Sequence, residues 1–304
     1  GVAYLANIDE MNRHTPFIEP IHSSNLCLEI CEPNRPYQDM RDLYSDKEVG
    51  YITVATADGS QQRFNFNEPL ALDDGRVIFA GHLKVGDVFL SRDQAAFSPV
   101  TQIIDTYAEP EVALCSLGAI ACDRIAEDDD DAYQEAMYLT LKMIDYCIEN
   151  THYVLPHIGV TAKARMNAGV GLMGVASRMA RKGLRYDTRE GREELHRIAE
   201  RHMYHAIRAS LRISKERGKP RWIHKTRWPE GWLPIDTYNR NVDALGDFKY
   251  QYNWEALRAE IIENGGIGHS CLVAYMPGES SSKALGLPNS IYPVRSTTLS
   301  KTDG

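Results

Sequence analysis

Three polar side chains with complementary chemistry recur at every second position near the start of the chain. Within the stretch SNLCLEI, residues 24–30, they are Asn25, Cys27 and Glu29: an amide, a thiol and a carboxylate. Written as a β-strand, the stretch places all three on one face, because successive side chains of a strand point to opposite faces. The pattern predicts either an ordinary strand with its polar face in water or a thiol held between a hydrogen-bonding amide and a base.

A second candidate site follows an apolar run near the other end of the chain. In MPGESSS, residues 276–282, a Pro-Gly turn precedes the start of a helical run. The candidate phosphate-binding residues are Pro277, Gly278, Glu279, Ser280 and Ser281. Backbone N–H groups and hydroxyls at the start of a helix suit a phosphate. Serines at this position are also ordinary N-caps, so the stretch alone leaves both interpretations open.

Six cysteines are spread along the chain: Cys27, Cys31, Cys115, Cys122, Cys147 and Cys271. None forms a C-x-x-C pair, and no Cys/His spacing resembles a zinc site, so no metal site is predicted. The first residues lack the features of a signal peptide, so we expect reduced thiols and a cytoplasmic location. Cys115 lies in ALCSLGAI, residues 113–120, whose pattern predicts a buried strand.

The composition is that of an ordinary globular chain, with 304 residues, 43% hydrophobic and 25% charged. The net charge of −8 argues against a nucleic-acid or membrane-surface partner, since phosphate groups recruit clustered Lys and Arg. No apolar run approaches the roughly 18–20 residues of a membrane span. The chain begins at Gly1 without Met and ends in TTLSKTDG, so we expect that both ends were cut from something larger.

Two kinds of pattern divide the chain. The sequence pattern predicts two extended segments joined by a loop in residues 1–31. It predicts a small all-β module of short strands and turns in residues 51–106. Beyond the module, apolar residues at helical spacing alternate with buried strand-like runs, which is typical of an α/β fold.

Helix signals are clearest in two places. One helix begins at the acidic run Asp128 to Asp131, and its apolar pattern runs through Ala136, Leu139, Met143 and Ile144. A longer helix ends at Gly218 after several basic residues. Its histidines are expected at the surface or partly buried; they are His196, His202 and His205.

Several stretches together resemble one known family. SNLCLEI, ALCSLGAI, LPIDTY (233–238), YNWEALR (252–258) and MPGESSS stand in the order found in the large, catalytic subunit of ribonucleotide reductase. The opening YLANIDEMNRHTPF is similar to the segment that leads to that family's active-site loop. The resemblance covers residues 1–47 and 110–304 and is closest to class I. It implies part of a ten-stranded α/β barrel around a finger loop.

The resemblance also implies roles for individual residues. Cys27 would become a thiyl radical that abstracts the ribose 3′ hydrogen, Glu29 would be the base on the 3′-hydroxyl, and Asn25 would bind the ribose hydroxyls. Cys115 would be one of two reducing cysteines that form a disulfide as the 2′-hydroxyl leaves as water. The segment from Pro277 to Ser282 would bind the substrate diphosphate. Ser24 is expected among the substrate-binding residues.

The implied partners lie outside these residues. The substrate would be a ribonucleoside diphosphate, or a triphosphate in the adenosylcobalamin-dependent branch. No cofactor would be bound directly: the radical would come from a separate metal-containing subunit, or from adenosylcobalamin in class II, and an external dithiol would re-reduce the site. The second redox cysteine, the radical-relay tyrosines, the C-terminal cysteine pair and the allosteric regions have no match here. We therefore expect the chain to be inactive without complementary reductase polypeptides.

Residues 48–109 interrupt the resemblance, because the family has only a short loop at this place. VATADG and GHLKVGDVFL faintly resemble the intein-type Hint fold. The module lacks a Cys or Ser at its start and a His-Asn pair at its end, so splicing is not expected. A β-rich insertion in a surface loop is the simpler interpretation. The alternative function is a non-catalytic interaction or processing protein, in which the reductase-like core is a scaffold and the insertion is the working part.

Overall fold

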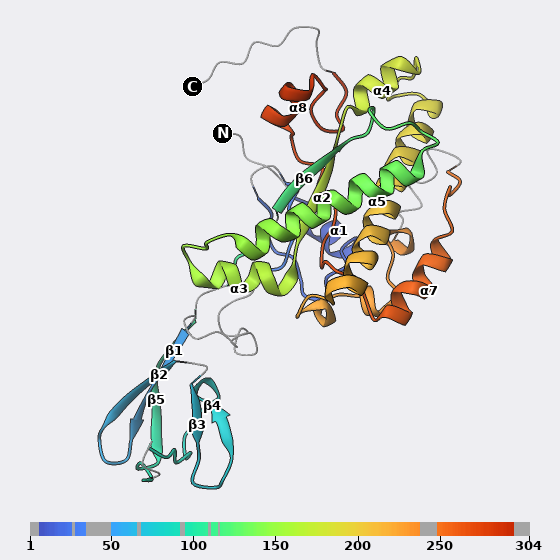
Figure 1. The fold of residues 1–304 in the computed structure, drawn as a ribbon. Coiled ribbons are helices and arrows are strands. Elements are labelled where there is room, and N and C mark those ends of the chain that lie inside the picture. The colour runs from blue at the N-terminus through green and yellow to red at the C-terminus, as the bar shows by residue number, and fades with distance from the viewer. Residues whose placement is uncertain are drawn as a thin grey trace, which may run out of the picture. The chain divides into compact units, whose positions relative to one another are not determined.

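The computed structural model describes residues 6–25, 28–34, 50–65, 68–91, 95–108, 111–114, 116–237 and 248–294 (Figure 1). The chain divides into two compact units. The first comprises Gly1–Pro33, Leu114–Thr151 and Ala162–Gly304, and the second comprises Asn34–Ala113 and His152–Thr161. The predicted domain boundaries at residues 47 and 110 stay a prediction.

The second unit contains the short strands that the sequence predicted. They are β1 (Gly50–Thr56), β2 (Gln61–Asn65), β3 (Pro69–Ala71), β4 (Val77–Phe79) and β5 (Val100–Ala108). One antiparallel sheet has the order β2-β1-β5, and a second pairs β3 with β4. The rings of Phe64 and Phe97 pack on the fully buried ring of Phe89, which gives this small unit an aromatic core.

The first unit is built around two parallel strands, β6 (Ser116–Ala121) and β7 (Ala168–Met173). Parallel neighbours require a crossover, and α2 (Asp130–Asn150) and α3 (Pro156–Arg165) lie between them in the chain. Every residue of β7 is buried, whereas α2 packs on β6 on one side and on α5 (Arg189–Arg217) on the other (Figure 1). The fold is therefore mixed α/β, and its described part holds a two-stranded parallel sheet here and no closed barrel.

Within the described residues, the remaining α-helices of this unit are α1 (Ile8–Arg13), α4 (Val175–Arg181), α7 (Trp254–Asn264) and α8 (Glu279–Leu285). The ends of the two longest helices, α2 and α5, follow local rules. The acidic run predicted to start α2 supplies its N-cap, Asp129, which accepts the N–H of Ala132 at 2.9 Å. α5 ends at Gly218, as predicted, with a φ of 90° that favours glycine.

Two predictions about this unit are wrong. Residues 8–13 form helix α1 and not an extended segment, because Asn7 caps it by accepting the N–H of Glu10. In α2, Leu139 and Met143 are 52% and 71% exposed and do not lie on the buried face. The buried face consists of Tyr133, Met137, Leu141, Ile144, Asp145 and Ile148. A long helix with apolar residues on more than one side does not reveal from its periodicity which side is covered.

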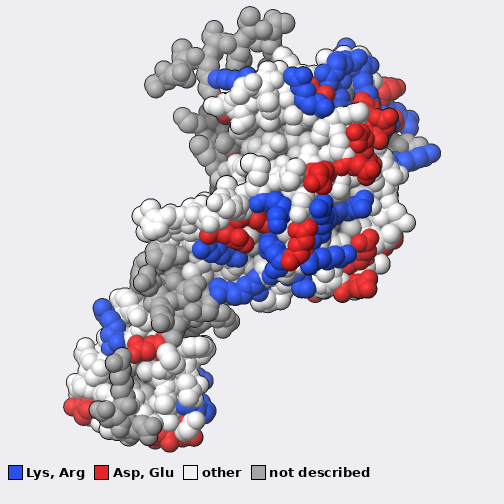
Figure 2. Space-filling view, in the orientation of Figure 1, with Lys and Arg blue, Asp and Glu red and all other residues white. Residues whose placement is uncertain are grey.

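Charges of both signs are interspersed on the face shown in Figure 2. On α5, for example, Arg212 pairs with Glu135 at 3.0 Å and with Glu216 at 3.3 Å. No helix within the described ranges has the length and apolar character needed to cross a membrane.

Candidate active site

Residues 24–25 and 28–31, which are called the finger loop below, form a turn and not a strand. The N–H of Leu28 donates to the C=O of Asn25 at 3.1 Å, and Leu28 has a φ of 62°. A positive φ at a branched residue is strained, and such strain concentrates at functional sites. The predicted strand is therefore wrong here, since alternation makes a strand only where another strand pairs with it. Leu26 and Cys27 lie outside the described residues.

The turn brings the side chains of Asn25 and Glu29 together. Asn25 Nδ2 donates to Glu29 Oε1 at 2.6 Å, and Asn25 Oδ1 accepts the N–H of Ile30 at 3.1 Å. The amide is thus held at both ends, and it fixes one oxygen of the carboxylate. The other oxygen, Glu29 Oε2, is buried and accepts no hydrogen bond from the described residues. A fixed carboxylate with a vacant acceptor can take a proton from a nearby hydroxyl.

Ser24 and Cys31 close the base of this turn. Ser24 Oγ donates to the C=O of Ile30 at 2.6 Å and lies 3.8 Å from Cys31 Sγ. Cys31 Sγ is also 3.8 Å from the C=O of Leu28. Burial raises the pKa of the Cys31 thiol above its ordinary value of 9.0. No role was predicted for Cys31, although its position just beyond the SNLCLEI stretch was a signal that could have been used.

The finger loop is anchored at the amino end of β7. Glu32 is 1% exposed and accepts a 2.5 Å hydrogen bond from Nδ2 of Asn167, the residue before β7. The C=O of Asn167 accepts the N–H of Ser116, the first residue of β6, at 3.5 Å. Cys115, which precedes Ser116 in the chain, lies outside the described residues.

The predicted phosphate-binding stretch lies at the opposite, carboxyl end of β7. A Cβ on Gly278 would be 2.8 Å from Sδ of Met173, the last residue of β7, so only glycine fits without a shift. The apolar run before it is an extended segment beside β7 and not a β-strand. The N–H groups of Ala168 and Val170 donate to the C=O groups of Cys271 and Leu272 at 3.1 and 2.9 Å, respectively.

Only some of the donor groups in the predicted phosphate-binding stretch are available to a ligand. The N–H groups of Gly278 and Glu279 donate to Oδ1 of Asn289, a residue that the sequence did not indicate. The C=O of Gly278 accepts the N–H of Ser281 at 2.9 Å. Ser280 and Ser281 are exposed, and their hydroxyls, like the N–H of Ser280, make no hydrogen bond within the described chain. Pro277 and Glu279 are exposed as well.

The histidines of α5 correct a further expectation, because two of them are fully buried. His202 is 0% exposed, and its Nε2 lies 2.8 Å from the C=O of Val170 in β7. That carbonyl can only accept, so Nε2 carries the proton and Nδ1 accepts the hydroxyl of Tyr133 at 2.8 Å. Burial lowers the pKa of His202 to about 4. His205 is 1% exposed. His202 and His205 are therefore interior side chains and not surface groups.

A buried Ser-His-Asp arrangement also links helices and does not form a hydrolytic site. His269 Nδ1 lies 2.8 Å from Ser210 Oγ, and His269 Nε2 lies 2.9 Å from Asp145 Oδ1. Ser210 and His269 are both 0% exposed, so no substrate can reach the serine. Burial opposes the charge of Asp145, but hydrogen bonds from His269 and Arg217 outweigh it and hold the pKa of Asp145 below its usual range.

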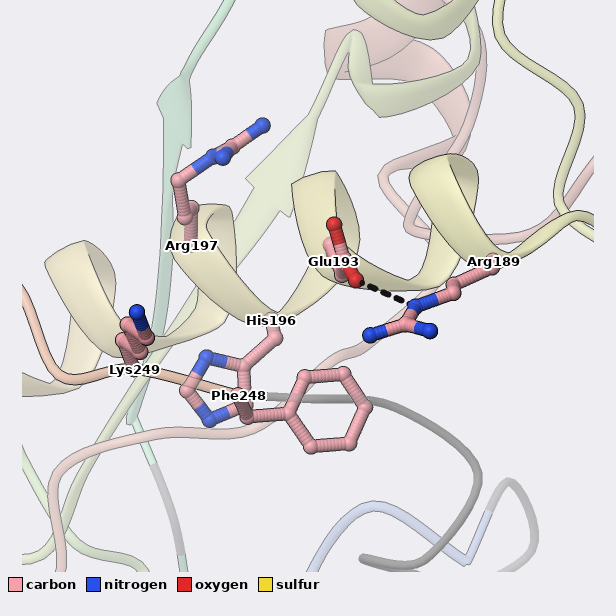
Figure 3. Close-up of a pocket in the computed structure, with 6 residues that line it drawn as sticks. All are labelled: Arg189, Glu193, His196, Arg197, Phe248 and Lys249. Atoms are coloured by element: carbon pink, nitrogen blue, oxygen red, sulfur yellow. Dashed lines mark hydrogen bonds and ion pairs between the residues drawn. The ribbon is translucent and has the colours of Figure 1, made fainter.

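A surface pocket of about 360 Å³ lies on the amino-terminal half of α5, apart from the finger loop residues (Figure 3). The ring of His196 stacks on Phe248 with centroids 4.6 Å apart, and Arg189 pairs with Glu193 at 2.9 Å. Arg197 and Lys249 complete the lining. None of the residues predicted to act on or bind substrate lines this pocket. Elsewhere in the described ranges, no three His, Cys, Asp or Glu side chains gather as metal ligands.

Comparison with known proteins decides the family. A family model described as "Ribonucleotide reductase, barrel domain" matches residues 1–304. The chain belongs to this family. The ribonucleoside-diphosphate reductase subunit alpha of Haemophilus influenzae is 27% identical over 298 residues, which are 97% of this chain and 30% of the relative. The subunit alpha of Enterobacteria phage T4 is 34% identical over 187 residues, or 62% of this chain and 24% of the relative.

A third relative, the ribonucleoside-diphosphate reductase 1 subunit alpha of Escherichia coli, is 35% identical over 143 residues, or 47% of this chain and 19% of the relative. This reductase barrel chain therefore spans no more than about a third of the length of these three curated relatives. The resemblance inferred from SNLCLEI, ALCSLGAI and MPGESSS is confirmed at the level of the family.

Proposed function

We propose that this chain forms the part of a ribonucleotide reductase that holds the ribose and the diphosphate of a ribonucleoside diphosphate. The observation that supports it best is the Asn25–Glu29 pair inside a strained turn, with Glu29 Oε2 buried and without a hydrogen bond from the described residues. Residues 1–47 and 110–304 would belong to the ten-stranded barrel of the family, with β6 and β7 as two of its strands and residues 48–109 as an insertion.

The proposed reaction divides the work among the finger loop residues. A thiyl radical at Cys27 takes the 3′ hydrogen of the ribose, while Glu29 Oε2 takes the proton of the 3′-hydroxyl. Asn25 keeps Glu29 Oε1 occupied, so that only Oε2 faces the substrate. The 2′-hydroxyl leaves as water, and two thiols, one of them Cys115, become a disulfide. The sum is one ribonucleotide and two thiols giving one 2′-deoxyribonucleotide, one disulfide and one water.

The diphosphate would lie at the other end of β7. The hydroxyls of Ser280 and Ser281 and the N–H of Ser280 are the available donors there. Asn289 holds the neighbouring N–H groups of Gly278 and Glu279 and so positions the loop. Hydroxyl and backbone donors of this kind bind phosphate oxygens.

The complete activity needs parts beyond these 304 residues. They are the second redox cysteine, the radical-relay tyrosines, a separate radical-generating metal subunit or adenosylcobalamin, and an external dithiol. We propose that complementary reductase polypeptides supply the first two. A cytoplasmic location stays a prediction.

Reconstitution with those polypeptides and a radical generator tests the proposal, with dCDP formation from CDP as the readout. Cys27→Ser and Glu29→Gln should abolish product, whereas Cys147→Ser, at an exposed thiol of α2, should leave it unchanged. Full dCDP formation by Cys27→Ser would sink the proposal. A different outcome would favour the alternative function as an interaction protein. In that case a partner binds the second unit, and the binding is unchanged in both Cys27→Ser and Glu29→Gln.

A further inference from the structure

Asn167 lies between the finger loop and the parallel sheet, and no role was predicted for it. It is 1% exposed, and its Nδ2 donates to Oε2 of Glu32 at 2.5 Å. Glu32, the residue that follows the finger loop, is itself 1% exposed. The backbone C=O of Asn167 accepts the N–H of Ser116 at 3.5 Å. One residue therefore contacts both the end of the finger loop and the first residue after Cys115.

The backbone on both sides of Asn167 is held. Met166 is 3% exposed and has a φ of 49°, and its N–H donates to the C=O of Ala162 in α3 at 2.8 Å. A positive φ is strained in a residue that has a Cβ, and such strain persists only where the surrounding contacts impose it. Ala168, the first residue of β7, donates its N–H to the C=O of Cys271 at 3.1 Å. The chain therefore leaves α3 by a sharp turn that fixes the backbone of Asn167.

The contact between Glu32 and Asn167 is a buried hydrogen bond between a carboxylate and an amide. A bond with one charged partner is roughly twice as strong as a bond between neutral groups. Because both residues are interior, loss of the contact would leave a buried polar group without its partner. A shift of the finger loop away from β7 must break this bond.

We infer that Asn167 is a positioning residue for the reaction proposed above, and this inference rests on that proposed function. Its side chain holds the finger loop, which carries Glu29, and its backbone holds the start of β6, which follows Cys115. In the proposed reaction both segments act on one ribose, and a displacement of about 1 Å can lower a rate about 100-fold. Asn167 acts through Glu32 and Ser116 and is assigned no contact with substrate.

Exchange of the two side-chain types tests the inference, because Asn and Asp have the same shape, as do Gln and Glu. Glu32→Gln keeps an acceptor for Asn167 Nδ2, so kcat for CDP in the reconstituted reductase should fall less than about 3-fold. Asn167→Asp sets two buried carboxylates against each other and should lower kcat about 100-fold, with KM nearly unchanged. The double variant again has one donor and one acceptor, in reversed positions, and should recover kcat to within about 10-fold of the unsubstituted enzyme.

Hydrogen exchange in the 304-residue chain provides a measurement that does not depend on turnover. The N–H groups of Leu28 and Ile30 both donate to Asn25 and close the turn. In Asn167→Asp the peptide covering residues 28–31 should exchange at least about 10-fold faster, while α5 keeps its protection. The double variant should restore the slow exchange. Asn150→Asp, at the exposed end of α2, is the matched control and should change neither exchange nor kcat.

Two results would overturn the inference. One is unchanged exchange of this peptide in Asn167→Asp, and the other is a double variant with a kcat as low as that of Asn167→Asp. Loss of protection along α5 in Asn167→Asp would show that Asn167 stabilises the whole unit and is not a positioning residue. Absence of dCDP from the unsubstituted reconstituted enzyme would remove the proposed function, and the exchange comparison would still decide whether Asn167 holds the finger loop.

Discussion

Asn25 donates from Nδ2 to Oε1 of Glu29 over 2.6 Å, and this contact organises the described part of the finger loop. The same amide accepts the N–H of Ile30 through Oδ1, so the carboxylate is held by a group that is itself held by the backbone. A base that is oriented before substrate arrives needs no rearrangement when the proton moves.

The first prediction concerns this contact. Asn25→Ala leaves Glu29 Oε1 and the N–H of Ile30 without their partner, which should lower the free energy of unfolding by about 1–3 kcal/mol. In the reconstituted enzyme it should lower kcat for CDP by about 100-fold, because the carboxylate is no longer oriented. Urea unfolding and steady-state kinetics measure the two effects. An unchanged kcat would show that Asn25 only stabilises the turn.

The second prediction concerns the packing of β7 against the segment that follows Cys271. A Cβ on Gly171 would meet Met276 Sδ and would lie 2.7 Å from the C=O of Ala274. Gly171→Ala should therefore lower the free energy of unfolding by about 1–3 kcal/mol, as overpacking does. Adding Met276→Ala should not restore it, since the backbone clash with Ala274 remains. Recovery in the double variant, measured by urea unfolding, would mean that this segment moves freely.

The third prediction concerns acid stability. The folded-state pKa of His202 is lowered to about 4, so the folded protein keeps His202 neutral while the unfolded chain protonates near pH 6.5. The stability is therefore fully present above pH 6.5 and is lost as pH falls toward 4, by about 3 kcal/mol in total. Urea midpoints between pH 7 and 4.5 measure this. His202→Gln should flatten the slope, and an identical slope in the variant would remove His202 as its cause.

The fourth prediction compares a buried with an exposed ion pair. Arg217 holds Asp145 through bonds of 2.8 and 3.0 Å, and Asp145 is 4% exposed. Arg217→Ala leaves a buried carboxylate short of a partner and should cost about 3–5 kcal/mol. Arg189→Ala, which breaks the exposed pair with Glu193, should cost less than about 1 kcal/mol. Thermal unfolding measures the loss of stability in the two variants. Equal losses would contradict the difference in burial between the two ion pairs.

Much of the local structure could be predicted from the sequence, because the hydrogen bonds that form and end a helix join residues close together in the chain. The acidic start of α2 and the glycine end of α5 are local signals, and both are where the sequence placed them. Asn25 and Glu29 could also be named as candidates, since five stretches in family order marked SNLCLEI as more than an alternating strand, and their roles stay a prediction. The family assignment followed from those stretches alone.

Other features were decided only by tertiary structure. The finger loop is a turn because no described strand pairs with it, and pairing is a contact that alternation cannot supply. His202 is buried with its ring between the C=O of Val170 in β7 and the hydroxyl of Tyr133 in α2, which its own helix does not reveal. Asn289 meets Gly278 only after the chain has returned to β7. The sequence by itself determined the local elements and the chemistry available, whereas long-range packing decided which of these groups face one another.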